Sequence, residues 1–143
     1  MSFFREVVKN GFYDKFLWVQ VFRPREYLYK DAYDAKTVLE NDISDLMEYF
    51  KVAQVLERSS ANVSGIVGEL VVSTVDIRSA SPPSPDSDPR GTPKGSQLID
   101  IVRSVYFDYG GLIWKISMRS YEKVAEEGRA DFEHVLKTFK ILD

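Results

Sequence analysis

The stretch Val105–Met118, VYFDYGGLIWKISM, predicts the centre of the fold. Two runs of β-branched and aromatic residues flank Gly110-Gly111, and paired glycines supply the positive φ angles of a two-residue hairpin turn. With these glycines as the loop, Tyr109 faces Leu112 and the pairing continues along both strands. One face then holds Val105, Phe107, Trp114, Ile116 and Met118, and the other holds Ser104, Tyr106, Asp108, Lys115, Ser117 and Arg119. Because a three-residue loop would mix these two sets, the register predicts a core face and a solvent face.

A helix is predicted upstream of this hairpin, within residues 35–58. Apolar residues recur there at steps of four and three, at Leu39, Ile43, Leu46, Phe50 and Ala53. Asp34 or Asn41 is the expected N-cap, and the prediction is centred on Ile43–Leu56. We expect the stripe Leu39–Phe50 to cover the apolar face of the hairpin.

The remaining segments complete an α+β pattern. Strands are predicted over Phe16–Phe22, Gly65–Arg78 and Gln97–Phe107, and a stripe of Phe132, Val135, Leu136 and Phe139 predicts a C-terminal helix. Within the second strand, Gly68 indicates a bulge or a close backbone approach. The order strand, helix, strand, loop, hairpin, helix is typical of helices segregated from a mainly antiparallel sheet.

The stretch Ser81–Gly95, SPPSPDSDPRGTPKG, holds five of the six prolines. Only 48 residues follow it, which is too few for a stable second domain without disulfides or metal. We therefore expect one domain over residues 1–143 with a long proline-rich loop at about 79–96. A docking peptide for an aromatic groove is the alternative. Weak order is expected in this loop, and its removal is expected to leave the fold intact.

Composition excludes several classes of site. The chain has no cysteine, so disulfides, thiolate metal sites and cysteine nucleophiles are excluded. The net charge of −3 argues against a nucleic-acid binder. No apolar run is long enough to span a membrane, which leaves peripheral association open. His134 is the single histidine and is expected on the surface, so we predict no catalytic residue, no metal site and no cofactor.

Six residues are candidates for contact with a partner or ligand. The stretch FRPREYLYKDAYD interleaves basic and aromatic residues, including Arg23, Arg25 and Tyr27. Such a mixture suits single-stranded nucleic acid or an acidic protein surface, although an exposed strand end and turn is the favoured interpretation. Trp18, Tyr106 and Trp114 are the expected lining of any pocket between the sheet and a helix.

Three phrases resemble the PsbP-like domains, which share their fold with the Ran-binding protein Mog1. They are GELVVSTVDI, IVRSVYFDYGGLIWKISM and DFEHVLKTFKIL, and they include Gly111-Leu112-Ile113-Trp114 and the phrase at 132–139. The resemblance covers about half of the chain. The N-terminal half departs from it, because Trp18 precedes Pro24 where the family has a tryptophan after the proline.

This resemblance implies an α-β-α sandwich around an antiparallel sheet and a non-enzymatic role, typically the binding of another protein at or near a membrane. If a leader was removed, it also implies an extracytoplasmic or thylakoid-lumen-like location. The leading hypothesis is therefore a non-catalytic protein-interaction or scaffold module. The alternative is a small apolar-ligand-binding protein, or a minor enzyme, with a pocket between sheet and helix.

Overall fold

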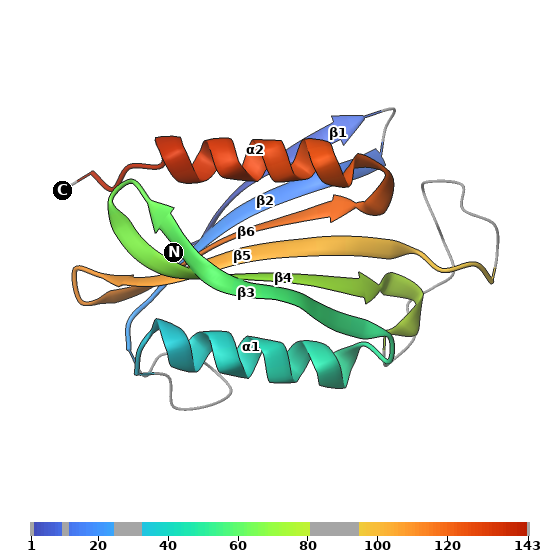
Figure 1. Cartoon of the computed structure of the whole chain (residues 1–143), viewed down its shortest axis with the longest axis horizontal. Helices are drawn as coiled ribbons and strands as arrows, with labels where there is room; N and C mark the ends of the chain where they lie inside the picture. Colours follow the sequence, from blue (N-terminus) through green and yellow to red (C-terminus); the bar gives the residue numbers. More distant parts are fainter. Residues whose placement is uncertain (1, 10–11, 25–32, 81–94, 143) are drawn as a thin grey trace.

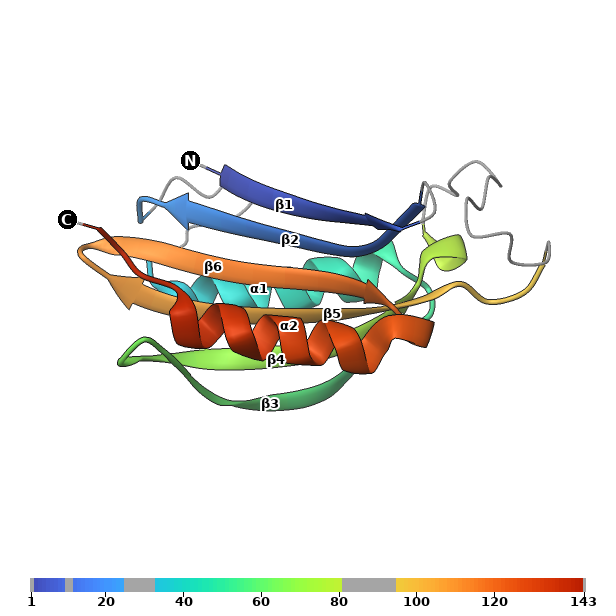
Figure 2. The ribbon, with the colours of Figure 1, turned by 90° about the horizontal axis from the view of Figure 1, so that it is seen from above.

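The computed structural model describes residues 2–9, 12–24, 33–80 and 95–142, and these form one sheet with a helix on each face (Figure 1). The described strands are β1 (Ser2–Lys9), β2 (Phe12–Phe22), β3 (Ala53–Val63), β4 (Ile66–Asp76), β5 (Ile99–Tyr109) and β6 (Leu112–Tyr121). All neighbours are antiparallel, in the order β1-β2-β6-β5-β4-β3. Helices α1 (Ala35–Tyr49) and α2 (Ala125–Thr138) lie on opposite sides, as Figure 2 shows from above. The predicted α+β sandwich is confirmed.

The central hairpin has the predicted register. Tyr109 pairs with Leu112 and Phe107 pairs with Trp114. Gly110 and Gly111 adopt φ angles of 63° and 73°, the left-handed conformation that a two-residue hairpin turn requires. The hairpin therefore forms the middle of the sheet, with β2 on one side and β4 on the other.

The two faces of the hairpin depart from the prediction, because both are covered. Ser104 and Tyr106, assigned to the solvent face, are each only 5% exposed, and Ser117 is fully buried. Helix α1 covers this side through Val38 and Leu39. The solvent-face prediction is wrong for these three residues, because polar groups can line a covered face when they are hydrogen-bonded.

The apolar face is covered by the other helix. Phe132 and Leu136 of α2 pack against the cluster of Val105, Phe107, Ile116 and Met118. The expectation that the stripe Leu39–Phe50 would cover this face is therefore wrong. Both helices carry an apolar stripe, and a stripe does not reveal which side of a sheet its helix joins.

The first helix is shorter than the predicted 35–58. It ends at Tyr49, and Phe50 has extended backbone angles and forms a β-bridge with Ala80. Strand β3 then occupies part of the expected helix. The apolar spacing through Ala53 fits a strand equally well, since Ala53 and Val55 also alternate with exposed residues. Strands β1 and β3, the two edges of the sheet, were both missed.

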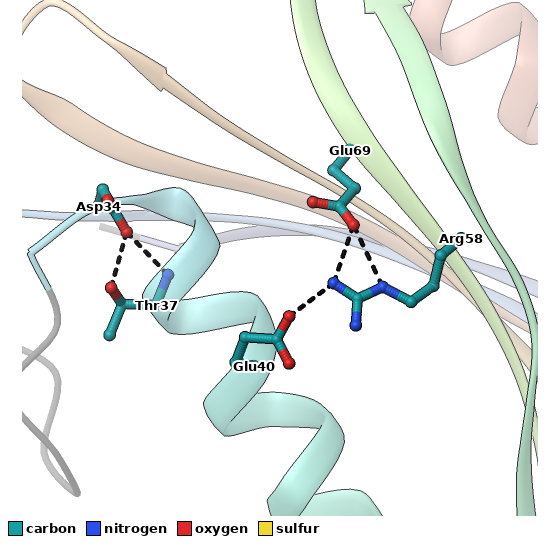
Figure 3. A network of polar contacts seen from close by, with 5 residues as sticks. All are labelled: Asp34, Thr37, Glu40, Arg58 and Glu69. Atoms are coloured by element: carbon teal, nitrogen blue, oxygen red, sulfur yellow. Dashed lines mark hydrogen bonds and ion pairs between the residues drawn. The ribbon is translucent and has the colours of Figure 1, made fainter.

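Side-chain contacts fix where α1 begins and join its exposed side, which we call its rim, to the sheet (Figure 3). The Asp34 carboxylate accepts hydrogen bonds from the backbone N–H and the hydroxyl of Thr37, at 2.8 and 2.7 Å, so Asp34 and not Asn41 is the N-cap. Along the helix, the Arg58 guanidinium contacts Glu40 at 2.6 Å. It also contacts Glu69 at 2.9 Å and so joins α1 to β3 and β4.

Two further predictions concern β4. A Cβ added to Gly68 would lie 2.8 Å from the carbonyl oxygen of Tyr106, which confirms a close backbone approach. The proline-rich stretch joins β4 to β5, which are paired neighbours in the sheet. Residues 81–94 lie outside the described part of the chain, so the expected weak order there stays a prediction.

Candidate functional site

A cavity of about 250 Å³ lies between α1 and the sheet, and we call it the α1 pocket. Its apolar wall consists of Ile43, Leu46, Val55, Val71 and Val102. Its polar and aromatic lining consists of Trp18, Asp42, Asp45, Ser73, Ser104, Tyr106, Lys115 and Arg119. Helix α1 packs closely on Tyr106, Ile113 and Val71 near its first two turns, and the pocket lies beside the later turns, where both polar and apolar side chains line it.

An ion pair links α1 to the sheet at this pocket. The Lys115 ammonium lies 2.7 Å from Asp42 Oδ2, and the Tyr106 hydroxyl donates to the same oxygen at 2.8 Å. Both charged side chains are largely buried, with exposed fractions of 14% and 15%. The Lys115 nitrogen also lies 5.4 Å from the centre of the Tyr106 ring. Partial burial strengthens such a pair, so Asp42, Tyr106 and Lys115 form a fixed polar group.

The floor of the pocket carries a second polar group. The hydroxyls of Ser104 and Ser117 lie 2.7 Å apart across the hairpin. Further along β6, Arg119 Nε lies 4.0 Å from Asp100, whose side chain is only 3% exposed. The cation of Arg119 therefore faces a buried carboxylate behind the pocket.

Trp18 lines the pocket on β2 and packs against Phe16 of the same strand. The rings of Phe16 and Trp18 have centroids 5.3 Å apart, and the Trp18 indole N–H donates to Gln20 at 3.2 Å. Trp18 pairs across the sheet with Ser117, which places it in the same row as the serines of the floor. The pocket thus combines an aromatic surface, an apolar wall and charged side chains.

The six sequence candidates do not gather at one place. Trp18 and Tyr106 both line the α1 pocket, as expected. Trp114 lies on the opposite face of the sheet, where its ring stacks on that of Phe107 with the ring centroids 6.0 Å apart. The prediction that Trp114 lines the same pocket as Trp18 and Tyr106 is therefore wrong. Arg23 is exposed just after β2. Arg25 and Tyr27 lie outside the described residues.

Four charged residues of the pocket were missed by the sequence analysis. Asp42 and Asp45 are three positions apart on α1 and off its apolar stripe, and Lys115 and Arg119 are on the polar face of the hairpin. The available signal was this pair of polar faces, one on a helix and one on a hairpin. It was interpreted as two solvated surfaces instead of one covered interface.

A smaller cavity, of about 180 Å³, lies on the α2 side and is bordered by Lys15, Asp131 and His134 among others. Lys15 contacts Asp131 at 2.6 Å and Glu127 at 2.7 Å. Burial alone would lower the pKa of Lys15, but the hydrogen bonds that its ammonium donates to these carboxylates outweigh burial and raise the pKa. His134 is exposed, as predicted. Two carboxylates neutralise the lysine, so this cavity has the features of a structural site.

Four exposed apolar side chains lie within ten positions of the chain, where α1 ends and β3 begins. Met47, Tyr49, Val52 and Leu56 are between 41% and 54% exposed, and we call them the end patch. The backbone beneath is fixed, because Lys51 N–H donates to the Ser79 carbonyl and Val52 N–H donates to the Ser79 hydroxyl, both at 3.0 Å. Exposed apolar groups held on a fixed backbone are typical of contact surfaces.

Within the described ranges, no group of three or more His, Cys, Asp or Glu side chains is placed to hold a metal ion. In the same part of the chain, no helix is long and apolar enough to cross a membrane. Among the charged groups of the α1 pocket, Asp42 and Lys115 are engaged in an ion pair and Arg119 faces Asp100, and the Ser104 hydroxyl is engaged by Ser117. The arrangement is suited to binding a molecule of modest size.

No protein-family model and no curated protein matches the sequence. Solved structures share the fold. One is PA94 from Pseudomonas aeruginosa, a protein of unknown function described as a putative regulator, with a TM-score of 0.65 and 5% identity over 100% of this chain and 84% of that one. Another is the cyanobacterial PsbP of Synechocystis sp., with a TM-score of 0.51 and 13% identity over 99% of this chain and 82% of that one. The predicted PsbP-like fold is confirmed, and the likeness to Mog1 stays a prediction.

Proposed function

We propose that this chain is a non-catalytic protein-interaction module, and that a partner protein docks on the end patch. The observation that carries the proposal is the exposure of Met47, Tyr49, Val52 and Leu56 within ten positions of the chain. Methionine and aromatic residues are enriched at protein interfaces, and four large apolar side chains exposed within so short a stretch are a candidate contact surface. The PsbP-like resemblance of the sequence implies the same class of role.

The end patch is suited to docking because it is rigid and has a polar rim. A β-bridge between Phe50 and Ala80 fixes the backbone below it, and the Asp76 N–H donates to the Val52 carbonyl at 2.9 Å. Exposed Glu48 and Lys51 border the apolar groups. A preorganised surface loses little conformational entropy on binding, which favours affinity. We infer that the partner presents an apolar surface with polar groups around it.

We also propose that residues 1–143 act as a single domain. Strand β4 precedes the proline-rich stretch and β5 follows it, and the two strands pair directly. The part after Gly95 contributes two central strands of the sheet, so it shares one core with the part before it.

Site-specific photo-crosslinking tests the docking surface. A photoreactive phenylalanine analogue replaces Tyr49 in one variant and Val67 in a second, because Val67 is 73% exposed and lies at the opposite end of the sheet from the patch. We expect a discrete adduct from position 49 in cells that express the protein, and none of the same mass from position 67. The captured protein is identified, purified and titrated against the wild-type chain.

The matched variants are Leu56→Asp and Val67→Asp. We expect Leu56→Asp to weaken binding of the purified partner at least tenfold while the melting temperature is retained, and Val67→Asp to bind as the wild type does. Equal labelling from both positions, an adduct formed only with a second copy of the chain, or unchanged binding by Leu56→Asp would each overturn the proposal.

A further inference from the structure

We propose that the α1 pocket binds a small organic cation, an ammonium group carried on a compact apolar or aromatic body. This inference is independent of the end patch. The pocket is lined by Ile43 and Leu46 on the inner side of α1, whereas Met47 and Tyr49 of the end patch are exposed. The argument uses the shape, the charge and the aromatic border of the cavity.

The apolar wall determines what the body of the ligand must be. Five aliphatic side chains surround the cavity, and its volume of about 250 Å³ is slightly below the range of drug-sized ligand pockets. A ligand of this size is a single ring or a short branched chain. Burial of such a body removes apolar surface from water, which is the main source of affinity for small ligands. A large or fully polar molecule fits neither the space nor the wall.

The charged side chains around the cavity determine which charge the polar group of the ligand must carry. The cation of Lys115 is matched by Asp42 at 2.7 Å, and that of Arg119 faces the buried Asp100. Asp45 is the second carboxylate of the lining, and no ion pair of Asp45 is found among the described residues. Asp100 lies outside the lining, so the lining itself holds two carboxylates and two cations, and Asp45 is the carboxylate that a ligand can reach. An anionic ligand would have to compete with Asp42 or Asp100 for its cation, whereas a monovalent cation can pair with Asp45.

The acidic residues of helix α1 and the ring of Trp18 also favour a positively charged ligand. Helix α1 carries four acidic residues, Glu40, Asp42, Asp45 and Glu48, against the single basic residue Lys36. The negative potential of this helix raises the local concentration of cations. Trp18 lines the pocket beside Arg119 and Ser104, and a tryptophan ring face attracts an ammonium group through its quadrupole. Charge and aromatic surface thus converge on one ligand class.

Three phenyl probes of similar size test the proposal: 2-phenylethylamine, 2-phenylethanol and phenylacetate. Binding is followed in two-dimensional NMR spectra through the indole N–H of Trp18, assigned with the variant Trp18→Phe. We expect the amine to shift this signal saturably, with an affinity about tenfold above that of the alcohol, the size of effect that one partly buried ion pair supplies. The carboxylate is expected to bind most weakly.

Matched variants locate the effect. Asp45→Asn should reduce the affinity for the amine to that for the alcohol, whereas Glu48→Gln makes the same charge change on an exposed part of the helix and should leave it within about twofold. Ser73→Leu fills the cavity floor and should abolish the shift of Trp18 while the spectrum stays folded. Equal binding of amine and alcohol, preferred binding of the carboxylate, no binding of any probe, or an unchanged affinity in Asp45→Asn would overturn the proposal. Failure here leaves the crosslinking result at position 49 unaffected.

Discussion

The two faces of the sheet carry helices of similar length, yet they are built differently. Under α2 the centre of the contact is apolar, with Phe132 and Leu136 against Phe107 and Ile116, while Lys15 of β2 pairs with Glu127 and Asp131 of the helix. Under α1 the contact is partly apolar, through Val38 and Leu39, and partly polar, through the Asp42–Lys115 pair and the serines of the floor. A cavity of about 250 Å³ remains on the α1 side. A smaller cavity of about 180 Å³ lies on the α2 side. The α2 contact is therefore the more apolar one at its centre, and the α1 contact leaves the larger site.

A pair of large-to-small substitutions gives the strongest test of this difference in packing between the two faces. Phe132→Ala should lower the free energy of unfolding by about 3–5 kcal/mol, because the ring is 2% exposed and leaves a cavity in close-packed surroundings. Leu39→Ala on the α1 side should cost about 2–3 kcal/mol, near the lower end for a buried leucine, since the neighbouring pocket lets the site relax. Urea denaturation measures both. His134→Ala is the exposed control, and a larger loss in Leu39→Ala than in Phe132→Ala would contradict the comparison.

The close approach of α2 to the sheet gives the next largest effect. A Cβ added to Gly128 would lie 2.1 Å from the Ser120 hydroxyl oxygen and 2.8 Å from its Cβ. Gly128→Ala should therefore cost about 1–3 kcal/mol through overpacking, despite the higher helix propensity of alanine. In the double variant with Ser120→Gly the two losses should be less than additive, because the clashing side chain is gone. Strict additivity in urea denaturation would show that α2 does not approach the sheet this closely.

The α2 face was also the half that the sequence predicts well. The alternation of Val105, Phe107 and Trp114 about two glycines determined the register, and the stripe of Phe132 and Leu136 determined the last helix. These signals are local, since they depend on residues within one turn or a few turns of the chain. The side of the sheet that a stripe joins is a long-range property, and for the stripe Leu39–Phe50 the predicted side was wrong.

The α1 face shows why the rest was not predictable from the sequence. Asp42 and Lys115 are 73 residues apart, and each taken alone is typical of a solvated surface. Only their meeting at 2.7 Å makes a covered interface with a pocket. The edge strand β3 was hidden for a related reason, because its exposed residues, such as Arg58, satisfy a helical pattern as well as a strand pattern. Pocket and edge depend on tertiary contacts that no local spacing records.

The polar contact of α1 can be tested through its ion pair. Asp42→Asn should destabilise the protein by about 1–2 kcal/mol, because the ammonium of Lys115, 14% exposed, loses its partner while the Tyr106 hydroxyl keeps an acceptor. The double variant with Lys115→Met should recover part of this loss. Asp45→Asn is the control and should change stability by less than about 0.5 kcal/mol. Urea denaturation gives the values, and no loss in Asp42→Asn would mean that the pair lies in water.

The beginning of each helix offers a smaller contrast, because α1 has a side-chain N-cap and α2 has none. Asp34→Ala should cost about 1 kcal/mol near neutral pH. Hydrogen bonds from the Thr37 hydroxyl and backbone favour the charged form and hold the pKa of Asp34 below its usual 3.8. Because the pKa is lower in the folded state, the ionised Asp34 carboxylate stabilises the fold at pH values above 3.8. This contribution to stability is lost as the pH falls through the folded-state pKa. The difference between wild type and variant should therefore shrink in acid, and a difference that persists there would contradict the cap.

The smallest expected effect concerns the rim of α1, where Arg58 joins Glu40 and Glu69. The contacts are short, but the Arg58 side chain is 36% exposed, so solvent screens them and Arg58→Ala should cost only about 0.2–1 kcal/mol. Thermal melts at low ionic strength and at about 1 M salt separate charge from packing, since the Debye length is then about 3 Å. We expect the difference in melting temperature to diminish at high salt. If it did not, the arginine would act through its apolar stem, and the rim of α1 would resemble the packed α2 face after all.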